Sequence, residues 1–137
     1  MKILVPLLTG KENAPNFVDV ITNKVDEIIL LQIVDKDFHS KTGAAMGEVR
    51  QFRMLLDVLK KEIGAKRKKY DELTEWGSTI PKIVSIALIR KVDKVVLVKQ
   101  NIQFFSDIVK ELKKNKIEVD VIEVVTLEEE NKKKPSK

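Results

Sequence analysis

The first loop that could carry chemistry contains Gly10 and Lys11, which follow an apolar run and Thr9. Phosphate-binding loops use such a glycine–lysine pair, but they also need an earlier glycine and a serine or threonine after the lysine. Both are missing here, and Glu12 stands where the hydroxyl group should be. Because the Glu12 carboxylate would repel phosphate, we do not expect a nucleotide-binding loop of this type.

The chain has a single histidine, His39, as a candidate for general acid–base chemistry. Asp35 and Asp37 precede it, and Ser40 and Thr42 follow it. The spacing of these residues supports no nucleophilic triad. We therefore interpret His39 as a solvent-exposed loop residue, and we expect no catalytic residue and no enzyme activity.

The composition excludes several classes of function. The 137 residues contain no cysteine, which excludes a disulfide scaffold, thiol catalysis and cysteine zinc sites, and one histidine cannot build a histidine metal site. A length of 137 residues, with 43% hydrophobic and 34% charged residues, is typical of one globular domain. No apolar run is long enough to span a bilayer, and the first residues show no signal-peptide cleavage region. We therefore expect a cytoplasmic protein without a bound metal or membrane contact.

The net charge of +5 is modest, and lysines alternate with acidic residues over most of the chain. The densest basic cluster is Lys66-Arg67-Lys68-Lys69. Mixed charges favour a solvated surface, so nucleic acid is not the partner we expect. A nucleic-acid-binding module that uses this cluster remains an alternative, and its affinity would fall steeply with salt because phosphate contacts release counterions.

Strands and helices are predicted to alternate along the chain. Apolar runs predict strands at residues 2–8, 28–34 and 95–98, and an alternating pattern predicts one at 117–125. Residues 70–76 are polar and predict a fifth strand, at an edge of the sheet. Amphipathic segments between them predict four helices, which begin near Asn13, Val49, Thr79 and Asn101. This order predicts an α/β fold with a doubly wound, five-stranded parallel sheet and helices on both faces. Ligands in such sheets bind at the carboxyl ends of the strands, where the strand order switches.

Five residues carry more specific expectations. Asn13 can cap the first helix, and Ser78 or Thr79 can cap the third. Gly64 is a plausible end for the second helix. Trp76 is expected to be a core or interface side chain.

Short motifs of the chain resemble the universal stress protein family over residues 1–125. Ile3-Leu4-Val5-Pro6 is similar to the first strand of that family, and Leu30–Asp35 resembles the second. The spacing of Gly77, Ile83 and Ala87 before Asp93–Val98 is also similar. The resemblance implies a Rossmann-like fold, similar to adenine nucleotide alpha hydrolases, with strand order 3-2-1-4-5. Residues 126–137 are predicted to form a charged, disordered tail.

The resemblance also implies a homodimer formed through the fifth strands. The interface residues it predicts are Ile117, Val119, Val121, Ile122 and Val124.

Family members that bind ATP carry Gly-x-x-Gly, a nine-residue gap and Gly-Ser/Thr after the fourth strand, and an aspartate after the first. Residues 99–106 contain no glycine, and Leu8 replaces the aspartate. We therefore expect neither tight ATP binding nor a bound cofactor. If an anion or nucleotide does bind, the candidate residues are Thr9, Asp35, Lys99, Gln100, Asn101 and Ser106.

The sequence thus predicts a non-enzymatic stress or regulatory protein of the branch that lacks the glycine-rich ATP motif. It would act as a homodimer through protein partners. The alternative is a nucleotide-binding regulator with a reshaped phosphate site, in which Lys99 would contribute to binding.

Overall fold

The structure is a computed structural model that describes residues 1–38 and 48–124. His39, Ser40 and Thr42 lie outside the described residues, as do Val125 and the predicted tail at 126–137. The expectations for these positions, and the division into a domain at 1–125 and a tail, therefore remain predictions.

Five parallel strands form one sheet with the order β3-β2-β1-β4-β5, which confirms the predicted topology. The strands are β1 (Lys2–Pro6), β2 (Glu27–Val34), β3 (Lys69–Trp76), β4 (Lys94–Val98) and β5 (Val119–Ile122). The register between β2 and β3 runs from Glu27 opposite Lys69 to Val34 opposite Trp76. The two short strands β1 and β4 lie side by side near the middle of the sheet.

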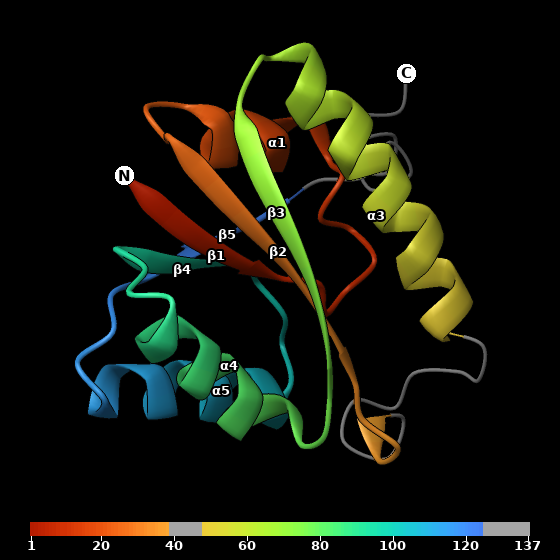
Figure 1. The fold of residues 1–137 in the computed structure, drawn as a ribbon. Coiled ribbons are helices and arrows are strands. Elements are labelled where there is room, and N and C mark those ends of the chain that lie inside the picture. Colours follow the sequence, from red (N-terminus) through yellow and green to blue (C-terminus); the bar gives the residue numbers. More distant parts are fainter. Residues whose placement is uncertain (39–47, 125–137) are drawn as a thin grey trace, which may run out of the picture.

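Helices cover both faces of the sheet (Figure 1). One face carries α1 (Pro15–Thr22) and α3 (Glu48–Ala65), and the other carries α4 (Thr79–Ile89) and α5 (Gln103–Lys114). Neighbouring residues of β1 divide between the two cores: Ile3 and Val5 pack towards α1 and α3, whereas Leu4 packs towards α4 and α5. Because both faces are covered, the inner strands β1, β2 and β4 need apolar residues on both sides, which explains their nearly continuous apolar runs.

None of the described helices is both long enough and apolar enough to cross a bilayer.

Two helix boundaries differ from those predicted. Asn13 is not the N-cap of α1, because the helix begins one residue later, after Ala14, and the Ala14 N–H donates to the Lys11 carbonyl at 3.0 Å. Gly64 does not end α3, which continues to Ala65. The chain reverses instead at Arg67, which adopts a φ of 58°.

The strands at the two ends of the chain are shorter than predicted. β1 ends at Pro6, and β5 contains four residues. Ile117 and Val124 flank β5 and are buried in opposite cores, one on each face of the sheet. These two residues of the predicted dimer interface therefore contribute to the core of their own chain.

β3 is an edge strand with a polar surface, as its composition predicted. Charged side chains on an edge discourage unwanted pairing with other chains. Trp76 at its carboxyl end is 73% exposed, so it is not a core residue of this chain.

Candidate functional site

A cavity of about 380 Å³ opens at the carboxyl ends of β1, β4 and β5. It is lined by Thr9, Lys11, Lys99, Gln100, Asn101, Ile102, Glu123 and Val124. The chain crosses to opposite faces of the sheet after β1 and after β4, so the cavity lies at the switch in strand order. Doubly wound sheets bind their ligands at this place.

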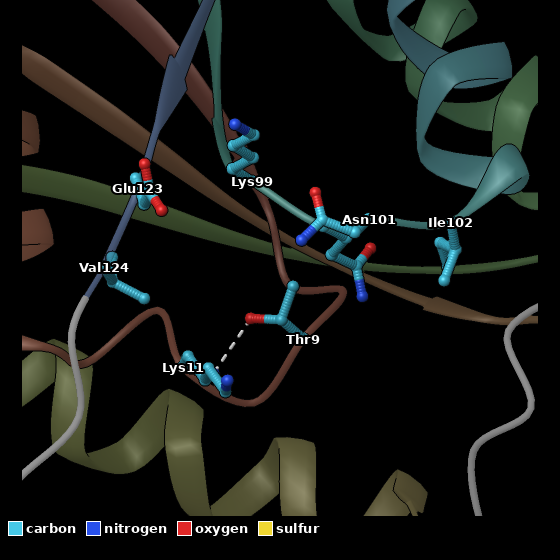
Figure 2. A pocket seen from close by; sticks show the side chains of 8 residues that line it. Thr9, Lys11, Lys99, Asn101, Ile102, Glu123 and Val124 are labelled. Atoms are coloured by element: carbon cyan, nitrogen blue, oxygen red, sulfur yellow. Dashed lines mark hydrogen bonds between the residues drawn. The ribbon is translucent and has the colours of Figure 1, made fainter. Parts of the chain in front are cut away.

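Three separate loops build the cavity. Figure 2 shows Thr9 and Lys11, from the β1–α1 loop, facing the segment after β4 that carries Lys99 and Asn101. Glu123 and Val124 approach from the end of β5. The lining therefore combines two ammonium groups with one hydroxyl group, two amide side chains and one carboxylate. Such a set of groups can hold a small anion that also offers hydrogen-bonding groups.

The structure brings together four of the six predicted site residues: Thr9, Lys99, Gln100 and Asn101 all line the cavity. Ser106 does not, because it lies in the first turn of α5 with an exposed side chain. Lys11 was not among the predicted residues, although it also lines the cavity.

Asp35 lies at the end of β2 and does not line the cavity. Its Oδ2 accepts hydrogen bonds from the N–H and the hydroxyl group of Thr79, at 3.0 and 2.8 Å, and its Oδ1 accepts one from the Asp37 N–H at 3.0 Å. Asp35 thus caps the start of α4 from a distant strand. Ser78 makes no side-chain capping bond, and the Thr79 hydroxyl group donates to Asp35, so the local cap predicted for α4 is wrong.

Glu12 has a structural role in this region that its sequence position did not indicate. Its side chain is buried, with the residue only 1% exposed, and it bends back into its own loop. Its Oε2 accepts hydrogen bonds from the N–H of Leu8 at 3.2 Å, the N–H of Thr9 at 3.1 Å and the Thr9 hydroxyl group at 2.9 Å. Its Oε1 accepts one from the Gly10 N–H at 3.0 Å. Successive N–H groups that converge in this way form an anion-binding nest, and Glu12 fills it.

Two opposing effects act on the Glu12 carboxyl group. Burial raises its pKa, whereas hydrogen bonds from Thr9 and from backbone N–H groups lower it, and burial has the larger effect. The pKa of Glu12 is therefore raised above its ordinary value. Because the nest is occupied, a ligand in the neighbouring cavity meets the side chains of Thr9 and Lys11 rather than these three backbone groups.

Comparison with known proteins identifies the fold. No family model matches the chain, and no curated protein matches it. A universal stress protein from Arabidopsis thaliana, solved with AMP bound, superposes with a TM-score of 0.67 over 93% of this chain and 94% of its own, at 13% identity. The chain has the universal-stress-protein fold.

Two further structures share the universal-stress-protein fold. The hypothetical protein MJ0577 is 22% identical, with a TM-score of 0.62 over 91% of this chain and 96% of its own. A universal stress protein from Archaeoglobus fulgidus, solved in complex with dAMP, is 14% identical, with a TM-score of 0.58 over 90% of this chain and 98% of its own. The likeness to these proteins establishes the architecture of the chain.

Within the universal-stress-protein fold, the position after β1 holds Leu8, where the family resemblance places an aspartate in ATP binders. Leu8 is buried in the core on the side of α4 and α5. An apolar core residue therefore occupies this position. The segment after β4 likewise offers the side chains of Lys99, Gln100 and Asn101 to the cavity in place of a glycine-rich loop.

Proposed function

We propose that this protein is a cytoplasmic, non-enzymatic regulatory protein that binds a small phosphate-bearing ligand, of the size of a nucleoside monophosphate, and does not bind ATP tightly. The observation that carries the proposal is the cavity at the switch in strand order, whose lining includes two lysines, one threonine and two amide residues (Lys11, Lys99, Thr9, Gln100 and Asn101). Ligand binding would regulate its contacts with protein partners.

The size of the cavity supports a small ligand. Pockets for small molecules span about 300 to 1,000 Å³, and this cavity, at about 380 Å³, lies at the lower end of that range. Proteins of the same fold have been solved with AMP, dAMP and cAMP bound. A ligand that carries a single phosphate group is consistent with both observations.

The charge of the lining supports the discrimination against ATP. A phosphate monoester carries roughly −1.5 to −2 charges at neutral pH, which two lysines can balance. A triphosphate brings more negative charge beside Glu123, and residues 99–106 contain no glycine that would let the backbone approach it. The backbone N–H groups of the β1–α1 loop already bind the Glu12 carboxylate.

The lining residues also support a binding role rather than an enzymatic one. Glu123 is the acidic residue of the cavity, and it is exposed. Among the described residues, the lining contains neither histidine nor cysteine, so these residues offer no imidazole or thiol that could act as general base or nucleophile.

Titration calorimetry with AMP tests the binding site. We expect wild-type protein to bind AMP with micromolar affinity, and Lys99→Glu to weaken binding at least tenfold, or about 1.4 kcal/mol, because it replaces an attractive charge with a repulsive one. Lys36→Glu makes the same charge change on an exposed residue that does not line the cavity, so it serves as the matched control. Equal affinity of the wild-type protein and Lys99→Glu would contradict the proposed site.

We also propose that two copies of the chain pair through β5. The N–H groups of Val95 and Lys99 donate to the carbonyls of Glu118 and Ile122. Within residues 118–122, the even-numbered residues therefore direct their backbone N–H and carbonyl groups towards β4. Val121 must then direct its N–H and carbonyl to the free edge, and its side chain is 39% exposed. Its free backbone groups and exposed side chain support pairing with a second copy.

A further inference from the structure

Basic residues occupy an unusual backbone conformation at the ends of the helices. Within residues 1–38 and 48–124, the non-glycine residues with positive φ are Lys24, Arg67, Lys91 and Lys116, with φ of 58°, 58°, 52° and 60°. All four lie in the left-handed region, where a side chain is sterically disfavoured. All four are basic, and each one follows a different helix.

The turns around three of these residues share one hydrogen-bonding pattern. The N–H groups of Arg67, Lys91 and Lys116 donate to the carbonyl three residues earlier, at 3.0, 3.2 and 3.0 Å. The next N–H in each turn donates to the carbonyl five residues earlier, at 3.3, 3.2 and 3.0 Å. This is the Schellman motif, whose left-handed position is usually a glycine. The chain thus carries cations where glycine fits the backbone better.

The fold gathers these four residues at one edge of the sheet. Each lies between a helix and the start of the next strand, and all the strands are parallel, so the four turns lie at the amino ends of the strands. In the order of the sheet they are Arg67 before β3, Lys24 before β2, Lys91 before β4 and Lys116 before β5. We name these four residues the amino-edge row.

The amino-edge row extends along the whole sheet. Neighbouring strands are about 4.8 Å apart, so the row spans roughly 19 Å. Figure 1 shows the four helix–strand connections along the margin of the molecule that carries the N-terminus. The cavity described above lies at the opposite, carboxyl ends of the strands. The row is therefore a separate surface.

The four residues of the row are exposed. No ion pair of the described residues includes any of them. Four acidic side chains near this edge are held by other groups: Asp19 by Lys66, Asp26 by the Met1 amino group, Asp71 by Arg90 and Asp93 by the Lys2 N–H. Glu118, two residues after Lys116, is exposed and offsets part of the charge at that end of the row. The charges of the row thus remain available to a partner.

Favourable interactions with helix dipoles do not explain all the cations of the row. A cation in the last turn of a helix interacts favourably with its negative end. α5 already has Lys113 and Lys114 in its last turn, so Lys116 adds a further exposed cation after that helix. Lys69, also exposed, adds to the charge beside Arg67.

We propose that the amino-edge row binds the phosphodiester backbone of a nucleic acid. The row follows the amino ends of the strands and consists mainly of lysine, which binds phosphate as a point charge. A phosphodiester backbone laid along this edge would contact the cations of the row. Such contacts carry no sequence information, so we expect binding without strong sequence preference.

Fluorescence anisotropy with a short labelled DNA duplex of mixed sequence tests this proposal. Each lost phosphate contact reduces the slope of log affinity against log salt by about 0.9, so removing four contacts reduces it by roughly three to four. We expect the row variant to show this flatter slope and at least a tenfold loss of affinity in low salt. The row variant carries Lys24→Gln, Arg67→Gln, Lys91→Gln and Lys116→Gln.

The control variant removes the same number of lysine and arginine charges from other exposed positions. It carries Lys36→Gln, Arg53→Gln, Lys61→Gln and Lys110→Gln. A third variant replaces all four row residues by glycine, which fits the left-handed turns and so separates loss of charge from loss of fold. We expect this glycine variant to melt within a few degrees of wild type and to lose binding as the row variant does.

Three results would overturn the proposal. One is the absence of wild-type binding to the duplex in low salt. Another is a loss of affinity for the duplex in the control variant equal to that in the row variant, which would indicate a general charge effect. The third is row-dependent binding to phosphatidylserine vesicles without binding to the duplex, which would assign the surface to a membrane.

Discussion

At the scale of single residues, Glu12 determines how the loop beside the cavity is built. Its carboxylate holds the N–H groups of Leu8, Thr9 and Gly10, and the Thr9 hydroxyl group then accepts the Lys11 N–H at 2.9 Å. Thr9 and Lys11 line the cavity. The placement of both residues therefore depends on Glu12.

Removal of the Glu12 carboxylate should destabilise the protein. Glu12→Ala leaves buried N–H groups without an acceptor, and one such group costs about 1 to 3 kcal/mol. We expect a loss of at least this size in the free energy of unfolding, measured by urea denaturation. Glu118→Ala changes an exposed residue and should alter the free energy by less than about 0.5 kcal/mol. Equal stability of the two variants would contradict the role assigned to Glu12.

The raised pKa of Glu12 predicts a pH dependence of stability. The Glu12 carboxyl group binds a proton more readily in the folded protein than in the unfolded chain, where its pKa is near 4.5. The stabilisation from protonated Glu12 is thus fully present below pH 4.5 and is lost as the pH rises through the raised pKa. Glu12→Gln has no carboxyl group to titrate at this position. The free energy of unfolding of the wild-type protein should therefore fall relative to that of Glu12→Gln as the pH rises across that window. Urea denaturation from acid to neutral pH measures the difference, and the opposite trend would indicate a lowered pKa.

The sequence predicted part of the residue-level site. Thr9, Lys99, Gln100 and Asn101 were predictable because residues after parallel strands meet at one edge. The role of Asp35 was not predictable, since its partner Thr79 is 44 residues away. The fold-back of the Glu12 side chain was not predictable either, because it depends on how three consecutive backbone N–H groups turn inwards.

At the scale of elements, β5 is the strand on which the proposed dimer depends. Val121→Pro removes an N–H that points to the free edge, whereas Asp120→Pro removes one that points to β4. We expect Val121→Pro to stay folded and to sediment as a monomer when the wild-type protein sediments as a dimer. Asp120→Pro should instead lower the free energy of unfolding by about 1 to 3 kcal/mol, because it leaves a ladder acceptor unpaired and also loses the ion pair with Lys94. A dimeric Val121→Pro would show that the chains pair elsewhere.

Element types were predictable, but several boundaries were not. The apolar alternation that predicted a strand at 117–125 continues past the four paired residues, because Ile117 and Val124 also fill the two cores. Gly64 was expected to end its helix because glycine usually occupies the left-handed position. The chain places Arg67 there instead, so the helix extends further than its glycine indicates.

At the scale of the whole molecule, the fold followed from the sequence because the inner strands β1, β2 and β4 are apolar on both faces and the strands alternate with amphipathic helices. The distribution of charge did not follow in the same way. Only the cluster at 66–69 was visible along the sequence, whereas Lys24, Lys91 and Lys116 are brought to the same edge by the parallel topology. The molecule thus has two candidate surfaces, with a ligand cavity at one edge of the sheet and exposed cations at the other.

The proposal that the cavity binds a ligand with a single phosphate group, and not ATP, is tested most directly by two calorimetric titrations of wild-type protein, one with AMP and one with ATP and magnesium. A denatured sample should first be checked for nucleotide carried through purification. We expect micromolar AMP binding at one site per chain and at least tenfold weaker ATP binding. Tight ATP binding, or ATP recovered from the purified protein, would contradict it, because the cavity would then hold a triphosphate without a glycine-rich loop.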